Sequence, residues 1–349
     1  MLVAGVRKAA DSADGVRYTL NHGSPRVFGI LVRLEAICAC HSDPLALPEP
    51  FMMMTLEDCR AFYSQEIRFA ANLATPGLVE AFARVPRETF LGPPPWLIGS
   101  AEVRALSAAG MVQMSYLPVE DPRDLYHNVV VSLDRSKDIN NGQPGSLARW
   151  IDGLALKPGD RAFHLGCGVG YYTAIIAEVV GPSGNVVGLE LDPALAARAK
   201  ENLAAYANVA VHAGDGAAFD PGPCDAIFVN CGVTHPQNTW LDRLREGGRL
   251  VVPFTMAMNS TLGQGIMTKI VRRSASYSAE MVSPVAIFSG GNLRDPALEP
   301  LMVNALRTGG LLKPKSVRRD AHDATDTCVL HALEVCLSSA ELSATASSQ

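Results

Sequence analysis

The clearest pattern in the chain is an alternation of short apolar runs with helical stretches between residues 161 and 254. Apolar runs separated by segments of helical period are typical of parallel strands joined by helical crossovers. The predicted strands are AFHLG at 162–166, NVVGLEL at 185–191, VAVHAG at 209–214, DAIFVN at 225–230 and, after the segment 240–245, GGRLVVPF at 247–254. The predicted helices are 171–180 and 193–206. We therefore expect an α/β fold with a mostly parallel sheet covered on both faces. Its ligand site should lie at the carboxyl ends of the strands.

Helical patterns also precede this alternation. Thr55 is placed to cap a helix over 55–74, and Thr75–Pro76 has the cap-then-proline order that begins a second helix. An apolar run at 128–133 predicts a strand, and helical spacing resumes after Pro144. The sequence thus predicts a helical and irregular N-terminal region at 52–143 and an α/β domain at 144–290.

The two ends of the chain have different patterns. Residues 1–51 have weak periodicity and end in proline-rich sequence, which predicts a poorly ordered extension. One hypothesis is that translation starts at Met52, Met53 or Met54. Residues 267–290 alternate enough for further strands, whereas 291–349 form a C-terminal addition in which 327–337 is either a strand pair or a short helix and 342–349 is a polar tail.

Composition and charge narrow the class of protein. Hydrophobic residues make up 48% of the 349 positions and the formal net charge is -5, which indicates a globular protein without a general affinity for nucleic acid or anionic membranes. We find no apolar run of about 20 residues, as a membrane-spanning helix requires, and no secretion signal. The eight cysteines contain no CxxC pair, so we expect free thiols in a reducing cytoplasm and no metal site.

Three glycines follow the first strand of the alternation. Gly166, Gly168 and Gly170 spell GxGxG, whereas the dinucleotide fingerprint is GxGxxG, and Tyr171 occupies the position of its third glycine. The Lys-Ser/Thr ending of a phosphate loop is also missing. The turn is therefore suited to close approach by a ligand carboxylate rather than by a pyrophosphate.

Acidic residues stand at the ends of the next two strands. Glu190 is placed to accept both hydroxyls of a ribose, and Asp215 could receive an adenine amino group beside the open space at Gly216. Ribose, adenine and a carboxylate without phosphate describe S-adenosylmethionine. A nicotinamide-binding domain and simple tight turns are the alternatives, and neither explains the two acids as well.

The chain also resembles the protein-L-isoaspartate (D-aspartate) O-methyltransferases, within the class I methyltransferases. The resemblance runs from about Leu78 to Phe254 and is carried by FARVPRETFLGP at 82–93, GQPGSLARWIDGLALKPGDR at 142–161 and CDAIFVNCGVTHPQNTWLDRLREGGRLVVPFT at 224–255. It implies a Rossmann-like sheet of seven strands with an antiparallel last strand, S-adenosylmethionine as the cofactor, and methyl transfer to a carboxylate of a protein or peptide.

Two positions depart from this family. The family's Thr-Ile-Ser-Gln-Pro stretch, whose serine lies at the substrate, corresponds to residues 140–144, where Gly142 replaces the serine. Isoaspartyl repair is therefore an open question, and Asn140 and Asn141 are either substrate contacts or an ordinary turn. His164 replaces an acid near the methionine moiety, as a hydrogen-bond acceptor or as a buried core residue.

Other candidates lie near the substrate. Asn230 ends the fourth strand, and His235 could be a general base for a hydroxyl or amine acceptor, although Thr234–His235–Pro236 also has the pattern of a helix start. The substrate-side candidates are Asn140, Asn141, Asn230 and His235, and the cofactor-binding candidates are His164, Gly166, Cys167, Gly168, Gly170, Tyr171, Glu190, Leu191, Asp215 and Gly216. A methyltransferase of a small metabolite and a non-catalytic S-adenosylmethionine-binding module remain the alternatives to carboxyl methylation.

Overall fold

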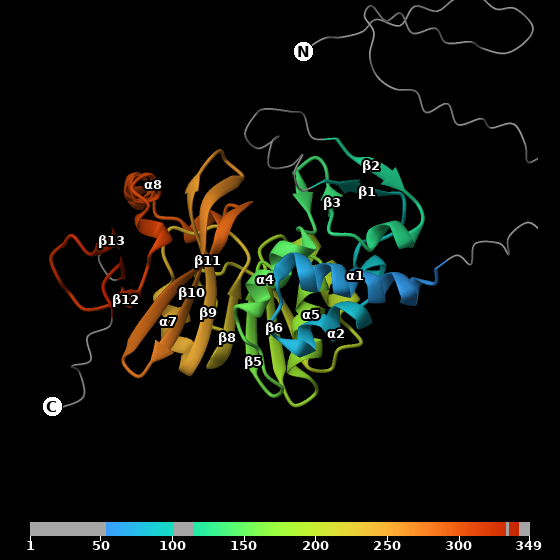
Figure 1. The fold of residues 1–349 in the computed structure, drawn as a ribbon, viewed down its shortest axis with the longest axis horizontal. Coiled ribbons are helices and arrows are strands. Elements are labelled where there is room, and N and C mark those ends of the chain that lie inside the picture. The colour runs from blue at the N-terminus through green and yellow to red at the C-terminus, as the bar shows by residue number, and fades with distance from the viewer. Residues whose placement is uncertain (1–53, 101–114, 333–334, 342–349) are drawn as a thin grey trace, which may run out of the picture. The chain divides into compact units, whose positions relative to one another are not determined.

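The computed structural model describes residues 54–100, 115–332 and 335–341 (Figure 1). The chain divides into two units, Met1–Met53 and Met54–Gln349, and the description that follows concerns the second. The predicted extension at 1–51, the alternative start positions and the polar tail at 342–349 lie outside the described residues.

One large mixed sheet organises the described chain. Its strand order is β13-β14-β12-β11-β10-β9-β8-β5-β6-β7. The parallel part comprises β7 (Val209–Ala213), β6 (Asn185–Glu190), β5 (Arg161–Leu165), β8 (Cys224–Val229) and β9 (Leu244–Ala257). The antiparallel part comprises β10 (Leu262–Arg273), β11 (Ser276–Phe288), β12 (Ser316–Arg318), β14 (Cys336–Ser338) and β13 (Cys328–His331).

The predicted α/β fold is confirmed, but the sheet is longer than the seven strands expected. The long hairpin of β10 and β11 continues the sheet beyond β9, and the C-terminal addition supplies three more short strands. The segment 327–337, for which a strand pair and a helix were both open, forms the strand pair β13–β14. The C-terminal addition is thus an extension of the sheet edge.

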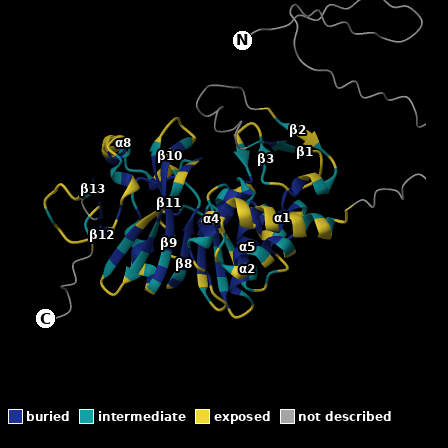
Figure 2. Cartoon of the chain, viewed as in Figure 1, coloured by how far each residue is buried: buried dark blue, intermediate teal, exposed yellow. Residues whose placement is uncertain are grey.

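Helices cover the two faces of the sheet unequally. One core joins the sheet to α1 (Leu56–Ala71), α2 (Pro76–Arg84), α4 (Pro144–Asp152), α5 (Tyr171–Val180) and α6 (Pro193–Asn202). The opposite core contains α7 (Asn238–Arg243) and α8 (Glu299–Arg307). Figure 2 shows dark, buried residues along the central strands between these layers. No helix among the described residues is long and apolar enough to cross a membrane.

The N-terminal region forms the predicted helices and a small second sheet. Thr55 caps α1 in a reciprocal pair with Asp58, and Pro76 opens α2 as expected, although the Thr75 side chain makes no capping bond. The small sheet has the order β2 (Leu117–Val119), β1 (Trp96–Gly99), β3 (Val130–Asp134) and β4 (Ile139–Asn140). The 3₁₀ turns are η1 (Arg87–Phe90), η2 (Pro122–Leu125), η3 (Gly291–Leu293), η4 (Pro296–Leu298) and η5 (Gly310–Leu312).

Arg87 joins η1 of the N-terminal region to the chain just before β3 through hydrogen bonds. Its side chain is fully buried. One guanidinium nitrogen donates to the carbonyls of Leu125 at 2.7 Å and His127 at 3.2 Å, and the other donates to that of Val129 at 2.8 Å. These bonds satisfy backbone acceptors immediately before β3, so they fix the start of a strand that contributes to the cavity described below.

We expect Arg87→Met to lower the free energy of unfolding by about 3 kcal/mol or more, because it leaves buried carbonyls without a charged donor. The matched control is Arg84→Met, since Arg84 is 58% exposed and pairs with Glu178 at the surface. Urea unfolding measures both variants, and equal small losses would contradict the role given to Arg87.

Candidate functional site

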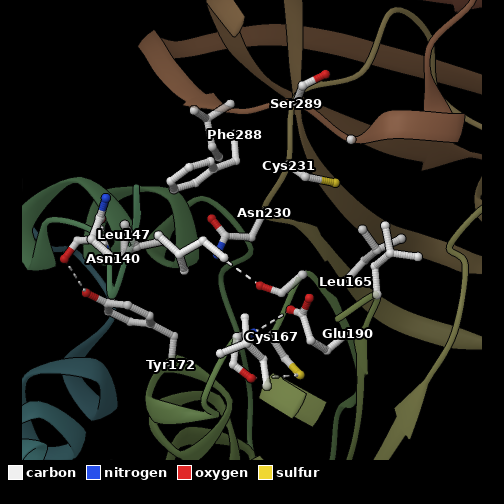
Figure 3. Close-up of a pocket in the computed structure, with 18 of the residues that line it drawn as sticks. Asn140, Leu147, Leu165, Cys167, Tyr172, Glu190, Asn230, Cys231, Phe288 and Ser289 are labelled. Carbon is white, nitrogen blue, oxygen red and sulfur yellow. Dashed lines mark hydrogen bonds between the residues drawn. The ribbon is translucent and has the colours of Figure 1, made fainter. Parts of the chain in front are cut away.

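A cavity of about 640 Å³ lies where the carboxyl ends of the parallel strands meet the β10–β11 hairpin and the start of α4. In Figure 3, Glu190 and Cys167 lie at one side, Phe288 and Ser289 at another, and Asn140 and Tyr172 at a third. The position at the strand ends is the one predicted from the α/β pattern. We call the part near the glycine turn the donor half, and the part near Asn140 and the hairpin the acceptor half.

The glycine turn has the open backbone that a close-fitting ligand requires. Gly168 has φ +57°, and a Cβ added there would meet nothing within 4 Å, so its space faces the cavity. Gly170 has φ +93°, and a Cβ there would come within 2.7 Å of Leu203 Cδ1. The first glycine leaves room for a ligand and the second allows α5 to pack against α6.

Glu190 is held in place at the end of β6. Its Oε2 accepts from the Gly168 N–H at 2.8 Å, and its Oε1 accepts from the Asp192 N–H at 3.1 Å. A carboxylate has further lone pairs beyond these two bonds. Glu190 therefore lines the donor half in a fixed position, with lone pairs left to accept further hydrogen bonds.

Asp215 is also fixed, but by a residue that the sequence did not indicate. Its oxygens accept from the Ala217 N–H at 2.9 Å and from Asn292 Nδ2 at 2.8 Å. Hydrogen bonds from Ala217 and then Asn292 lower the pKa of Asp215. The carboxylate thus stays ionised, and a ligand amino group would share it with Asn292, which comes from η3 far along the chain.

Amides and apolar side chains line the acceptor half. Asn140 Oδ1 accepts from the Gly142 N–H at 2.9 Å. The Nδ2 atoms of Asn140 and Asn141 are shielded from solvent and have no hydrogen-bond partner. Gly142 has φ +72°, and a Cβ there would lie 2.8 Å from Leu147 Cδ2. Leu147 therefore occupies the space that a serine side chain at position 142 would need.

Ten of the predicted site residues line the cavity together: Asn140, Asn141, Gly166, Cys167, Gly168, Glu190, Leu191, Asp215, Gly216 and Asn230. Asn230 donates from Nδ2 to the Gly166 carbonyl at 3.1 Å, which ties the end of β8 to the glycine turn. The lining residues that sequence reasoning did not select include Asp192, Ser289 and Phe288. The sequence could have indicated Asp192, because it lies two residues after Glu190 and directly before the predicted helix that begins at Pro193.

His164 does not line the cavity. Its ring is fully buried, stacks on Phe228 at 5.0 Å between centroids, and lies with Nδ1 2.9 Å from Thr173 Oγ1. Burial lowers the pKa of His164 to about 3. Of the two interpretations left open for this residue, the buried core histidine is the one observed.

Gly170, Tyr171 and His235 also lie outside the lining. Gly170 lies at the contact between α5 and α6. Tyr171 is buried against Phe82 and Phe90, and its hydroxyl lies 3.4 Å from that of Tyr63. The next residue, Tyr172, is the tyrosine that reaches the cavity. His235 lies with Nδ1 3.0 Å from Thr234 Oγ1, and Thr234 does not cap a helix, since α7 begins at Asn238.

This strand order, with a glycine turn after the first strand and an acid after the second, is the one expected of a class I S-adenosylmethionine-dependent methyltransferase, and the family match below distinguishes it from a nicotinamide-binding domain. The family model for protein-L-isoaspartate (D-aspartate) O-methyltransferase matches residues 106–287, more than half of the chain, so the chain belongs to this family. The match starts later and ends later than the 78–254 expected from the sequence.

Proteins similar to this chain in sequence or in fold carry the name of the same family. The chain is 34% identical to the protein-L-isoaspartate O-methyltransferase of Ignicoccus hospitalis over 173 residues, covering 47% of this chain and 79% of that protein. It is 33% identical to that of Methanothrix thermoacetophila, covering 52% and 75%. A solved protein-L-isoaspartate O-methyltransferase structure, with a TM-score of 0.54 and 23% identity over 71% of this chain and 69% of the other, shares the fold.

We expect Glu190→Gln to weaken binding of S-adenosylhomocysteine by about 10- to 100-fold, because the hydrogen bonds to ribose would lose a charged acceptor. Glu201→Gln, at an exposed position on α6, is the matched control and should bind as the wild type does. Isothermal titration calorimetry measures both, and equal affinities for the two variants would contradict a ribose contact at Glu190.

The burial of His164 predicts acid sensitivity. Its pKa falls from 6.5 to about 3 in the folded state, so below pH 6.5 the unfolded chain takes up a proton that the folded chain does not. Stability is lost as the pH falls through this window, by about 2 kcal/mol between pH 6.5 and 5.

The His164→Phe variant should lose this part of the pH dependence, whereas replacement of the exposed His127 by Gln should keep it. Urea unfolding at a series of pH values compares the slopes rather than the absolute stabilities. Parallel slopes for the wild type and His164→Phe would show that His164 does not titrate as described.

Proposed function

We propose that this S-adenosylmethionine-dependent methyltransferase transfers the methyl group to a carboxylate of a peptide or protein, and that an isoaspartyl residue is the acceptor. The family assignment supports this reaction type. The observation that carries the choice of acceptor is the chemistry of the acceptor half, where amides meet an apolar wall and no described side chain is suited to remove a proton.

The titratable lining residues support a carboxylate acceptor. Glu190, Asp192 and Asp215 belong to the donor half. Burial raises the pKa of Cys231 to about 12 and that of Tyr172 well above its ordinary value, so neither is a base near neutral pH. A carboxylate is already ionised and needs no base, whereas a hydroxyl or amine acceptor would need one. The position of His235 outside the lining removes the support for that alternative.

The unpaired side-chain amides of Asn140 and Asn141 would bind such a carboxylate. Buried N–H groups without a partner cost about 1–3 kcal/mol each, so a structure that keeps two of them beside a cavity favours a ligand that accepts hydrogen bonds there. A side-chain rotation that presents the Asn140 and Asn141 amides to the cavity would let them donate to a carboxylate. We propose these two residues as the contacts that take the place of a serine at position 142.

The methyl donor would be held by Gly166, Gly168, Glu190, Asp215 and Gly216. The space predicted to be open at Gly216 is filled by Leu165, since a Cβ at Gly216 would lie 2.2 Å from Leu165 Cδ1. Bound S-adenosylmethionine supplies an electrophilic methyl group on a sulfonium. The chain's own part is to hold the acceptor oxygen in line with that methyl group and to keep water out, which the apolar wall at residues 284–288 favours. The cytoplasm is the compartment that we propose, and this rests only on the spacing of the cysteines, which predicts free thiols.

The test incubates the purified protein with methyl-labelled S-adenosylmethionine and either an isoaspartyl peptide or its normal aspartyl twin. We expect base-labile methyl ester on the isoaspartyl peptide alone. Labelling of neither peptide, with binding of the methyl donor confirmed by calorimetry, would contradict the proposed acceptor.

The Asn140→Asp variant refines this test, since aspartate keeps the oxygen that accepts from Gly142 but replaces the amide donor by a negative charge. We expect kcat/KM for the peptide to fall about 10- to 100-fold while the affinity for S-adenosylhomocysteine is unchanged. Asn304→Asp, at an exposed position on α8, is the control. An unchanged kcat/KM in Asn140→Asp would remove Asn140 from the acceptor site.

A further inference from the structure

The C-terminal strands bring together four side chains that play no part in the cavity. His322, Cys328, His331 and Cys336 each offer one ligand atom, and these four atoms lie within 4.8 Å of one another. Cys328 and His331 are the first and last residues of β13, and Cys336 opens β14 directly opposite His331. His322 reaches the cluster from the connection between β12 and β13.

The hydrogen bonds of His322 resemble those of a metal-binding histidine. A backbone carbonyl can only accept a hydrogen bond, so the 2.7 Å contact between His322 Nδ1 and the Asp320 carbonyl places the ring proton on Nδ1. His322 Nε2 then carries a lone pair, which accepts a hydrogen bond from Cys328 Sγ at 3.6 Å. Metal-binding histidines commonly donate their other N–H to a carbonyl or carboxylate in this way.

His331 adds a second observation. Its Nδ1 is shielded from solvent and has no hydrogen-bond partner. Its ring meets that of His322 edge to face, with 4.7 Å between centroids. A buried ring nitrogen without a partner is unfavourable unless something binds it, and the His331 side chain belongs to the same cluster as two thiols.

We propose that His322, Cys328, His331 and Cys336 form a structural zinc site. Two thiolates and two imidazoles in a tetrahedron are a ligand set that zinc prefers. Zinc–sulfur and zinc–nitrogen distances of about 2.3 and 2.0–2.1 Å require a sulfur-to-nitrogen separation of about 3.6 Å in a tetrahedron. The observed separation of His322 Nε2 and Cys328 Sγ has this value. Since all four ligand atoms lie within 4.8 Å of one another, the other pairs need to close by about 1.5 Å at most to reach the separations of about 3.3–3.8 Å in such a site.

The zinc ion would stabilise the outer edge of the sheet. β12, β13 and β14 have only three or four residues each, so backbone pairing alone holds this edge weakly. Four ligands from residues 322–336 would cross-link the strand pair and the loop that precedes it. Binding releases the two thiol protons and links the metal to the folding of this edge.

The test measures the zinc content of the full chain, purified in a reducing buffer, incubated with zinc chloride and freed of excess metal. We expect about one tightly held zinc per chain for the wild type. The double variant Cys328→Ser/Cys336→Ser should lose it, whereas Cys59→Ser, which changes a free cysteine on α1, should keep it.

Cobalt substitution of the wild type tests the site without the double variant, whose folding the loss of two cysteines could impair. We expect the thiolate-to-cobalt charge-transfer band and the intense visible bands of tetrahedral Co²⁺, together with faster proteolysis after residue 318 when the metal is removed. A reduced wild-type chain that holds no zinc would overturn the proposal. So would octahedral cobalt bands, or a Cys328–Cys336 disulfide found in the protein purified under non-reducing conditions.

Discussion

The hydrogen bond between the Gly168 N–H and the Glu190 carboxylate is the contact on which the proposed methyl-donor site depends. It joins the turn after β5 to the end of β6, at the edge where the parallel strands present their carboxyl ends. The Asn230 amide adds the end of β8 to the same turn through the Gly166 carbonyl. Because three strand ends are tied to one glycine turn, the donor half is organised before any ligand binds. This preorganisation lowers the cost of binding a flexible nucleoside.

The acceptor half is assembled differently, from segments distant in the chain. Asn140 ends β4 of the small N-terminal sheet, and Asn141 follows it. Arg87 holds the chain just before β3 of the same sheet by a hydrogen bond to the Val129 carbonyl. Phe288 comes from the β10–β11 hairpin. Changes in either segment can reshape the acceptor half while the glycine turn stays as it is. Gly142, where the resemblance implies a serine, lies in such a segment, and Leu147 fills the space that a serine side chain would need. The same fold can in this way keep its methyl donor and alter the shape of its acceptor.

The sequence was sufficient to predict the α/β fold and most of the donor half, because Gly166, Gly168, Glu190 and Asp215 are placed by strand ends alone. It could not place His164 and Tyr171, since their direction depends on which face of β5 or α5 is covered. His164 turns to Thr173 beneath α5, and Tyr171 turns to the helices of the N-terminal region. Phe288 reaches the cavity, and Asn292 reaches the Asp215 carboxylate, only through tertiary packing. The histidine and cysteine cluster was missed because the search was for CxxC pairs, whereas the ligands follow the spacing HxxxxxCxxHxxxxC at 322–336.

The central claim is that the cavity binds the methyl donor through the glycine turn and Glu190 and presents an acceptor carboxylate to Asn140 and Asn141. A crystal structure of the protein with S-adenosylhomocysteine and an isoaspartyl peptide tests it most directly. We expect ribose hydroxyls on the Glu190 carboxylate, the adenine beside Asp215 and Gly216, and the peptide carboxylate on the amides of Asn140 and Asn141. A nucleoside bound elsewhere, or a peptide that leaves these amides without contact, would contradict it.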